Sequence, residues 1–193
     1  FFPDPFVMFR FVIPLLLSLV DVGIFFFLRR FFGLAAAFIF YFNPLTVILT
    51  GYNSHFDNIA ILLALIAAVL YGKHEKQNNR KEKNVALILL GASLVVKHIF
   101  IAFPLWLAFR QRSWRDRLLV LLVPFGVFGL SFLPFMQDGL TGIVNNVFLY
   151  VSFKNAPLWH FFILNGFPRV LNEYILFGGA LILGAYLFRK KPV

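Results

Sequence analysis

Long apolar runs alternate with short charged loops along this chain. None of the runs shows the strict alternation of apolar and polar positions that is typical of a barrel strand, so each is predicted to be helical. A region of mixed composition, residues 136–173, separates the last two runs. The six apolar runs cover about residues 11–28, 33–50, 58–71, 84–109, 118–135 and 174–188.

The composition makes a lipid bilayer the expected surroundings. Hydrophobic residues make up 61% of the chain and charged residues 13%, and the mean hydropathy is +0.84. A soluble domain of 193 residues could not bury this much apolar surface. We therefore predict an all-α fold, a polytopic transmembrane helical bundle that forms a single domain over residues 1–193. The chain begins Phe1-Phe2-Pro3 without a signal peptide, so we expect a fragment that lacks at least its N-terminal part.

The run at 84–109 decides the topology. As a single crossing, it would place the arginines of residues 110–117 opposite the lysine-rich loop at 73–83, against the rule that basic loops face the cytoplasm. As a broken-helix hairpin that bends near Lys97-His98, it would return to the side from which it came. We predict the hairpin, because it leaves only four of the eighteen Lys and Arg residues near the other side: Arg10, Lys97, Lys154 and Arg169.

Charge and motifs exclude several classes of function. The net charge of +10 does not indicate nucleic-acid binding, because the basic residues lie in short loops between apolar runs. The absence of cysteine excludes disulfides, iron–sulfur clusters and thiolate zinc sites. No phosphate-binding P-loop, HExxH or GxSxG pattern occurs, so ATP-driven transport and metalloprotease chemistry receive no support.

The polar loop at 51–57 contains the first candidate site residues, Asn53, His55 and Asp57. Polar groups that border hydrocarbon are costly and are usually functional. His55 and Asp57 could serve as an acid–base pair, as metal ligands or as organisers of a phosphate site. Alternatively, Asp57 caps the following helix by accepting the backbone N–H of Ile59 or Ala60, and this role is compatible with the others.

Two charged residues lie within apolar runs. Lys97 must pair with a carboxylate, a carbonyl or an anionic ligand. An ion pair with Asp21 or Asp57 and a contact with a lipid phosphate both stay open. Asp21 is expected to face the interior of the bundle and to form a hydrogen bond across helices.

Two further polar positions adjoin prolines. Asn43 and Pro44 predict a kink or a helix start, because proline leaves a backbone carbonyl without its donor and asparagine can satisfy such groups. Asp4 lies between two prolines on the extracytoplasmic side. It is a turn or capping residue, or a candidate for catalysis.

Residues 10–155 resemble the GT-C superfamily of membrane glycosyltransferases. The closest likeness is to its mannosyl- and glucosyltransferase branch, which uses polyprenyl- or dolichyl-phosphate sugars. The stretch NNVFLYVSF at 145–153 resembles an outer segment of these enzymes. The other matching features are Asp21 before an arginine pair, Asn43-Pro44, Gly51 with the polar loop to Asp57, and Lys97 followed by an apolar run and Pro104.

The resemblance implies an inverting hexosyltransferase. It would move glucose or mannose from a lipid-phosphate donor to an acceptor hydroxyl, on a lipid-linked or glycan acceptor, at the extracytoplasmic or lumenal face. The protein would be a multi-pass membrane enzyme of a prokaryotic plasma membrane or the endoplasmic reticulum. Its partners would be the bilayer, the lipid-phosphate sugar and the acceptor, with no nucleic acid.

The resemblance also implies roles for individual residues. The catalytic base would be an acidic residue in the first outer loop, which would lie before residue 1 or at most reach Asp4. Asn53, His55, Asp57 and Lys97 would line the substrate site, with cations stabilising the departing phosphate. No cofactor is implied beyond the lipid-phosphate sugar as donor substrate, and participation of a divalent metal stays open.

Two rival functions come from other classes, a transporter or flippase-like protein with a central Lys-Asp pair and a non-catalytic membrane scaffold. A transporter is expected to have matching broken helices in its two halves. The sequence shows one broken run, at 84–109, and no second copy, which favours the enzyme.

Overall fold

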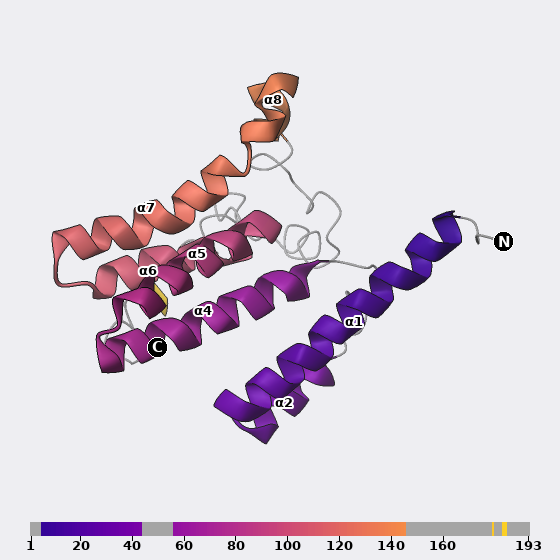
Figure 1. Cartoon of the computed structure of the whole chain (residues 1–193), viewed down its shortest axis with the longest axis horizontal. Coiled ribbons are helices and arrows are strands. Elements are labelled where there is room, and N and C mark those ends of the chain that lie inside the picture. The colour runs from indigo at the N-terminus through magenta and orange to yellow at the C-terminus, as the bar shows by residue number, and fades with distance from the viewer. Residues whose placement is uncertain (1–4, 44–55, 146–178, 180–182, 185–193) are drawn as a thin grey trace, which may run out of the picture.

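The computed structural model of the chain describes residues 5–43, 56–145, 179, 183 and 184, and every regular element among them is helical (Figure 1). The predicted all-α fold is thus confirmed for the described residues. The 3₁₀ helices are η2 (His98–Phe100) and η3 (Leu133–Asp138). The α-helices are α1 (Pro5–Phe31), α2 (Leu34–Tyr41), α4 (Asp57–Gln77), α5 (Arg80–Val96), α6 (Ala102–Arg110), α7 (Trp114–Leu130) and α8 (Leu140–Ile143).

Helices α1 and α2 form a hairpin that packs against the first half of α4. Gly33 lies in the turn between them with a φ of 94°, a conformation that a residue with a side chain rarely adopts. Phe25 of α1 makes edge-to-face ring contacts with Phe38 and Tyr41 of α2, at centroid distances of 5.6 and 5.5 Å. The three helices share one apolar cluster, which contains Ile24, Leu28, Ala37, Ile61, Leu62 and Leu65.

Helix α2 ends earlier than the apolar run from which it was predicted. The run extends over about 33–50, but α2 ends at Tyr41, and Asn43 follows as an exposed residue outside the helix. Proline disfavours the helical conformation of the residue before it, so Pro44 accounts for an end near this point. Pro44 itself lies outside the described residues, and so does the predicted run at 174–188 apart from residues 179, 183 and 184.

A two-residue asparagine turn joins α4 to α5. Asn78 adopts the left-handed conformation, with a φ of 52°, and its N–H donates to the carbonyl of His74 at 2.7 Å. The side chain of Asn79 then accepts the N–H of Lys81 at 3.0 Å and caps the start of α5. Asparagine tolerates the left-handed region better than most residues, so this turn reverses the chain within two positions.

Helix α5 packs between α4 and α7. On its α4 side, the buried Ser93 hydroxyl donates to the carbonyl of Ala60 at 2.9 Å. On its α7 side, a Cβ at Gly91 would lie 2.6 Å from the Cβ of Val127 and 3.0 Å from the carbonyl oxygen of Pro124. Small residues thus allow close helix contact on both faces. One core joins α4, α5, α6 and α7 and contains Ala67, Tyr71, Ala86, Leu87, Leu90, Leu107, Ala108 and Val120.

The predicted break near Lys97-His98 is present. Helix α5 ends at Val96, Lys97 is extended, and η2 precedes α6. Lys97 lies beside Asp57, the first residue of α4, whereas Arg110 at the end of α6 lies beside Glu75, near the last residue of α4. Because α6 returns to the end at which α5 begins, the broken-helix hairpin is confirmed for the described residues.

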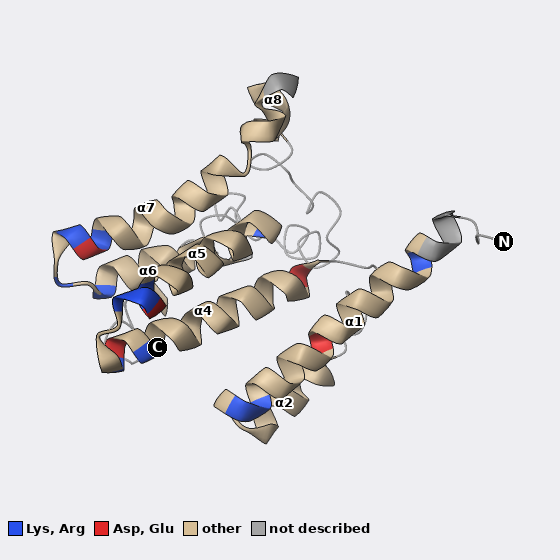
Figure 2. Cartoon of the chain, in the orientation of Figure 1, with Lys and Arg blue, Asp and Glu red and all other residues tan. Residues whose placement is uncertain are grey.

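Apart from Asp57 and Lys97, the charged residues of α4 to α7 gather at one end of the four-helix unit that these helices form (Figure 2). Arg29 and Arg30 lie apart from them. Asn58, the second residue of α4, donates a hydrogen bond to Asp21 of α1, and α1 and α4 run in the same direction (Figure 1). Arg29 is eight residues beyond Asp21, or about 12 Å, so the arginine pair lies roughly half-way along α4.

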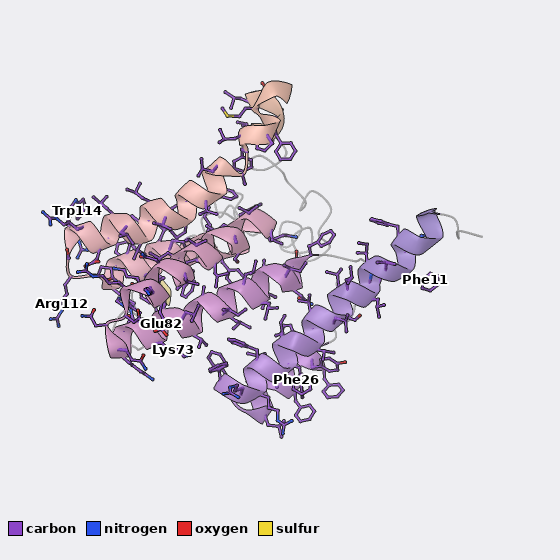
Figure 3. The ribbon with its side chains drawn as sticks, viewed as in Figure 1. Phe11, Phe26, Lys73, Glu82, Arg112 and Trp114 are labelled. Atoms are coloured by element: carbon purple, nitrogen blue, oxygen red, sulfur yellow. The ribbon has the colours of Figure 1, made fainter. Side chains whose placement is uncertain are left out.

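Two described helical segments are long and apolar enough to cross a membrane, Phe9–Phe31 and Asp57–Gln77. Helices α5 and α7 have 17 residues each and reach about 25 Å, less than the roughly 30 Å of a hydrocarbon core. Large apolar side chains, such as Phe11 and Phe26 (Figure 3), are exposed on α1, α2, α5, α6 and α7. These features support membrane association, and the number of crossings is part of the proposal below.

Replacing Gly91 by alanine is expected to lower the free energy of unfolding by about 1–3 kcal/mol, because the added methyl group forces α5 and α7 apart. Thermal unfolding in a neutral detergent, followed by circular dichroism, measures the loss. Gly126→Ala is the matched control, since a Cβ at this position of α7 meets no atom within 4 Å. Equal stability of the two variants would contradict close packing at Gly91.

Candidate functional site

The candidate site is an ion pair at the point where α5 breaks. The Nζ atom of Lys97 lies 2.6 Å from Oδ1 of Asp57, and the two side chains are 37% and 21% exposed. Lys97 follows the last residue of α5, and Asp57 is the first residue of α4. Of the two carboxylates considered as partners for Lys97, the structure therefore selects Asp57, which leaves the ammonium partly open to its surroundings.

Asp57 does not cap α4, so this prediction is wrong. Phe56 occupies the N-cap position, and its carbonyl accepts the N–H of Ile59 at 3.0 Å. The helix starts early enough to place Asp57 within the first turn, from which its carboxylate reaches Lys97. Its Oδ1 makes this ion pair without a hydrogen bond of standard geometry. A negative charge in the first turn is also stabilised by the positive end of the helix dipole.

Asn58 connects the site to α1. This residue is only 5% exposed, and its side-chain amide donates a hydrogen bond to Oδ1 of Asp21. The hydrogen bond across helices that we expected of Asp21 is therefore present. Sequence reasoning missed Asn58 and Ser93, although a buried amide and a buried hydroxyl in apolar helices are themselves a signal, because each must find a partner in the protein.

Four of the other predicted residues lie outside the described part of the chain. These are Asp4, Pro44, Asn53 and His55. Asn43 is described and exposed, and its backbone N–H donates to the carbonyl of Phe40 at 3.3 Å. Within the described residues, the site therefore brings together Asp57 and Lys97 from the predicted set, with Asp21 joined through Asn58.

The opposite end of the four-helix unit holds two more ion pairs. Nζ of Lys83 lies 2.5 Å from Oδ1 of Asp116, and the Lys83 ammonium, through this hydrogen bond and its charge, holds the pKa of Asp116 below its usual value. Nη2 of Arg110 lies 2.9 and 3.0 Å from the two carboxylate oxygens of Glu75. The guanidinium of Arg110 also lies over the ring of Trp106, 4.9 Å from its centroid. These contacts fix the charged end of the bundle.

The chemistry available at the Lys97 site is anion binding. An ammonium that is partly exposed at a helix end can exchange one oxygen partner for another, such as a phosphate oxygen for the carboxylate of Asp57. Among the described residues, no group of three or more His, Asp or Glu side chains could hold a metal ion. Comparison of the chain with protein-family models, with curated proteins and with solved structures found no match.

The Lys97–Asp57 pair is expected to have a coupling energy of about 1 kcal/mol, because both side chains are partly exposed. A double-mutant cycle of Lys97→Gln and Asp57→Asn, measured by thermal unfolding in detergent, gives this value. Asp57→Asn combined with Lys83→Gln is the control and should be additive, since these residues lie at opposite ends of α4 and α5. Additivity in both cycles would contradict the ion pair.

Proposed function

We propose that this chain belongs to a membrane glycosyltransferase that moves a hexose from a polyprenyl- or dolichyl-phosphate donor to an acceptor hydroxyl. The observation that carries the proposal is the Lys97 ammonium, held at a helix break by Asp57, at the end of the bundle opposite the basic loops. Such a cation is suited to the phosphate of a lipid-linked sugar at the extracytoplasmic or lumenal surface. The resemblance of residues 10–155 to the GT-C superfamily supports the same function.

The proposed reaction is a single inverting displacement. The acceptor hydroxyl oxygen attacks the anomeric carbon of the hexose, while the bond from this carbon to the lipid phosphate oxygen breaks. A carboxylate base takes the hydroxyl proton, and the lipid phosphate leaves with the electron pair. Lys97 would bind the phosphate, whose negative charge grows as the bond breaks, so the interaction is stronger in the transition state than in the ground state.

Asp57 has a matching role in this proposal. Before the donor binds, it neutralises Lys97, so that the cation is not left unpaired beside apolar helices. When a phosphate takes its place, the released carboxylate remains in the first turn of α4, where the helix dipole stabilises it. Asp57 thus acts as a positioning residue for Lys97 and not as the base.

The membrane arrangement is part of the proposal. Asp57–Gln77 would cross the bilayer, and the apolar helices α1, α2, α5, α6 and α7 would complete a multi-pass bundle around it. The loops at 73–83 and 110–117 would face the cytoplasm, because they hold nine basic and three acidic residues. Asp57 and Lys97 would then face the extracytoplasmic or lumenal side.

A transporter is the second candidate, because the Lys97–Asp57 pair is also the feature that it would use. Its substrate site is expected near the middle of the membrane, between repeated halves. The pair instead lies at the ends of α4 and α5, which favours the enzyme. Lys97-dependent movement of a lipid-linked sugar across vesicles, without transfer to an acceptor, would favour the transporter.

In the natural full-length protein, Lys97→Ala is expected to reduce transfer from a polyprenyl-phosphate hexose by about a hundredfold, the usual effect of removing one charge-stabilising group. Lys97→Arg should retain part of the activity, because it keeps a cation at the helix break. Lys81→Ala, at the opposite end of α5, is the control and should be as active as the parent. Unimpaired transfer by a folded Lys97→Ala variant would refute the phosphate contact.

The proposed topology predicts opposite labelling of the two ends of the bundle. The chain has no cysteine, so single cysteines can be introduced without background. Phe56→Cys, beside Asp57, should react with a membrane-impermeant maleimide added outside intact cells or outside right-side-out vesicles. Arg112→Cys should react only after the membrane is opened. Labelling of Arg112→Cys from outside would overturn the assignment.

A further inference from the structure

We propose that the basic end of the four-helix unit binds anionic lipid headgroups of the membrane leaflet around it. The basic end consists of residues 73–83 and 110–117. It contains nine basic and three acidic side chains, a formal excess of six positive charges. This inference rests on the membrane placement proposed above but not on the transferase reaction.

Two of the three acidic side chains of the basic end already form ion pairs with basic side chains. Asp116 binds Lys83, and Glu75 binds Arg110. Glu82 has a buried carboxylate oxygen with no hydrogen-bond partner among the described residues. Six basic side chains are exposed and make no ion pair within the described part of the chain: Lys73, Lys76, Arg80, Lys81, Arg112 and Arg115.

Trp114 indicates that this charge meets a lipid surface. This residue is 67% exposed and lies between Arg112 and Arg115 in the sequence. Arg112 and Trp114 both point away from the turn between α6 and α7 (Figure 3). Leu118 and Leu122, four and eight residues further on, are exposed on the same face of α7. Along this face, an arginine suited to the lipid headgroups is followed by a tryptophan suited to the membrane interface and then by leucines suited to the hydrocarbon.

This order distinguishes a lipid surface from other anionic partners. A nucleic acid or a soluble phosphate would use the arginines and lysines but would give no role to an exposed apolar row that starts beside them. Attraction to an anionic leaflet extends over about one Debye length, so exposed side chains can contribute without fixed partners. The surface therefore selects lipids by charge and depth and does not need a closed pocket.

Lipid retention by the purified full chain tests the proposal. The protein is equilibrated in a neutral detergent with equal amounts of phosphatidylglycerol and phosphatidylcholine, and the lipids that remain after gel filtration are measured by mass spectrometry. The parent should prefer phosphatidylglycerol about tenfold, and Arg112→Gln/Arg115→Gln should lose most of this preference, since each basic residue near an anionic surface contributes a few-fold. Half-molar salt should have the same effect on the parent.

The control is Arg29→Gln/Arg30→Gln, which removes the same charge from a pair that lies half-way along α4. It should keep the preference of the parent. If both double variants lose this preference equally, or if neither does, the proposal is overturned.

Displacement of the lipid by free glycerol phosphate would show a soluble phosphate site instead. If Arg112→Gln/Arg115→Gln fails to fold, Lys76→Gln/Lys81→Gln replaces it. The transferase and labelling experiments do not depend on this result.

Discussion

The burial of α5 between α4 and α7 is the constraint on which the described fold depends. Leu87, Leu90 and Leu94 of this helix are almost completely buried. In the proposed bilayer, apolar side chains would gain little by exchanging lipid for protein, so close packing and buried polar bonds would have to hold the helices together. Gly91 allows close packing on the α7 side, and the hydrogen bond from Ser93 to Ala60 is a buried polar bond on the α4 side.

The same packing sets the register that creates the candidate site. Ser93 pairs with Ala60, and Lys97 pairs with Asp57. One turn forward along α5 thus corresponds to nearly one turn back along α4, as expected for antiparallel helices. The ion pair is therefore the continuation of a packed interface, and a shift of either helix by one turn would separate the two charges.

The sequence could predict the break at Lys97 because two independent patterns agree there, a charge within an apolar run and the distribution of basic loops. It could not choose between Asp21 and Asp57 as the partner of Lys97, because this choice depends on the register of α4 and α5. The prediction that Asp57 caps α4 was wrong for a similar reason. Whether a carboxylate caps a helix or reaches across to another depends on which residue begins the helix, and Phe56 rather than Asp57 occupies the N-cap position.

In the proposed function, the position of Asp57 would keep the Lys97 cation ready for an anion in apolar surroundings. An ammonium without a partner would be costly there, whereas a fully buried ion pair would be hard to open. The Lys97–Asp57 pair lies between these limits, since it is partly exposed at two helix ends. A phosphate that replaces Asp57 leaves a carboxylate at the positive end of α4. In the proposed exchange the carboxylate would thus lose its cation but keep the stabilisation by the helix dipole, which suits the ion pair to be the resting state of the proposed phosphate site.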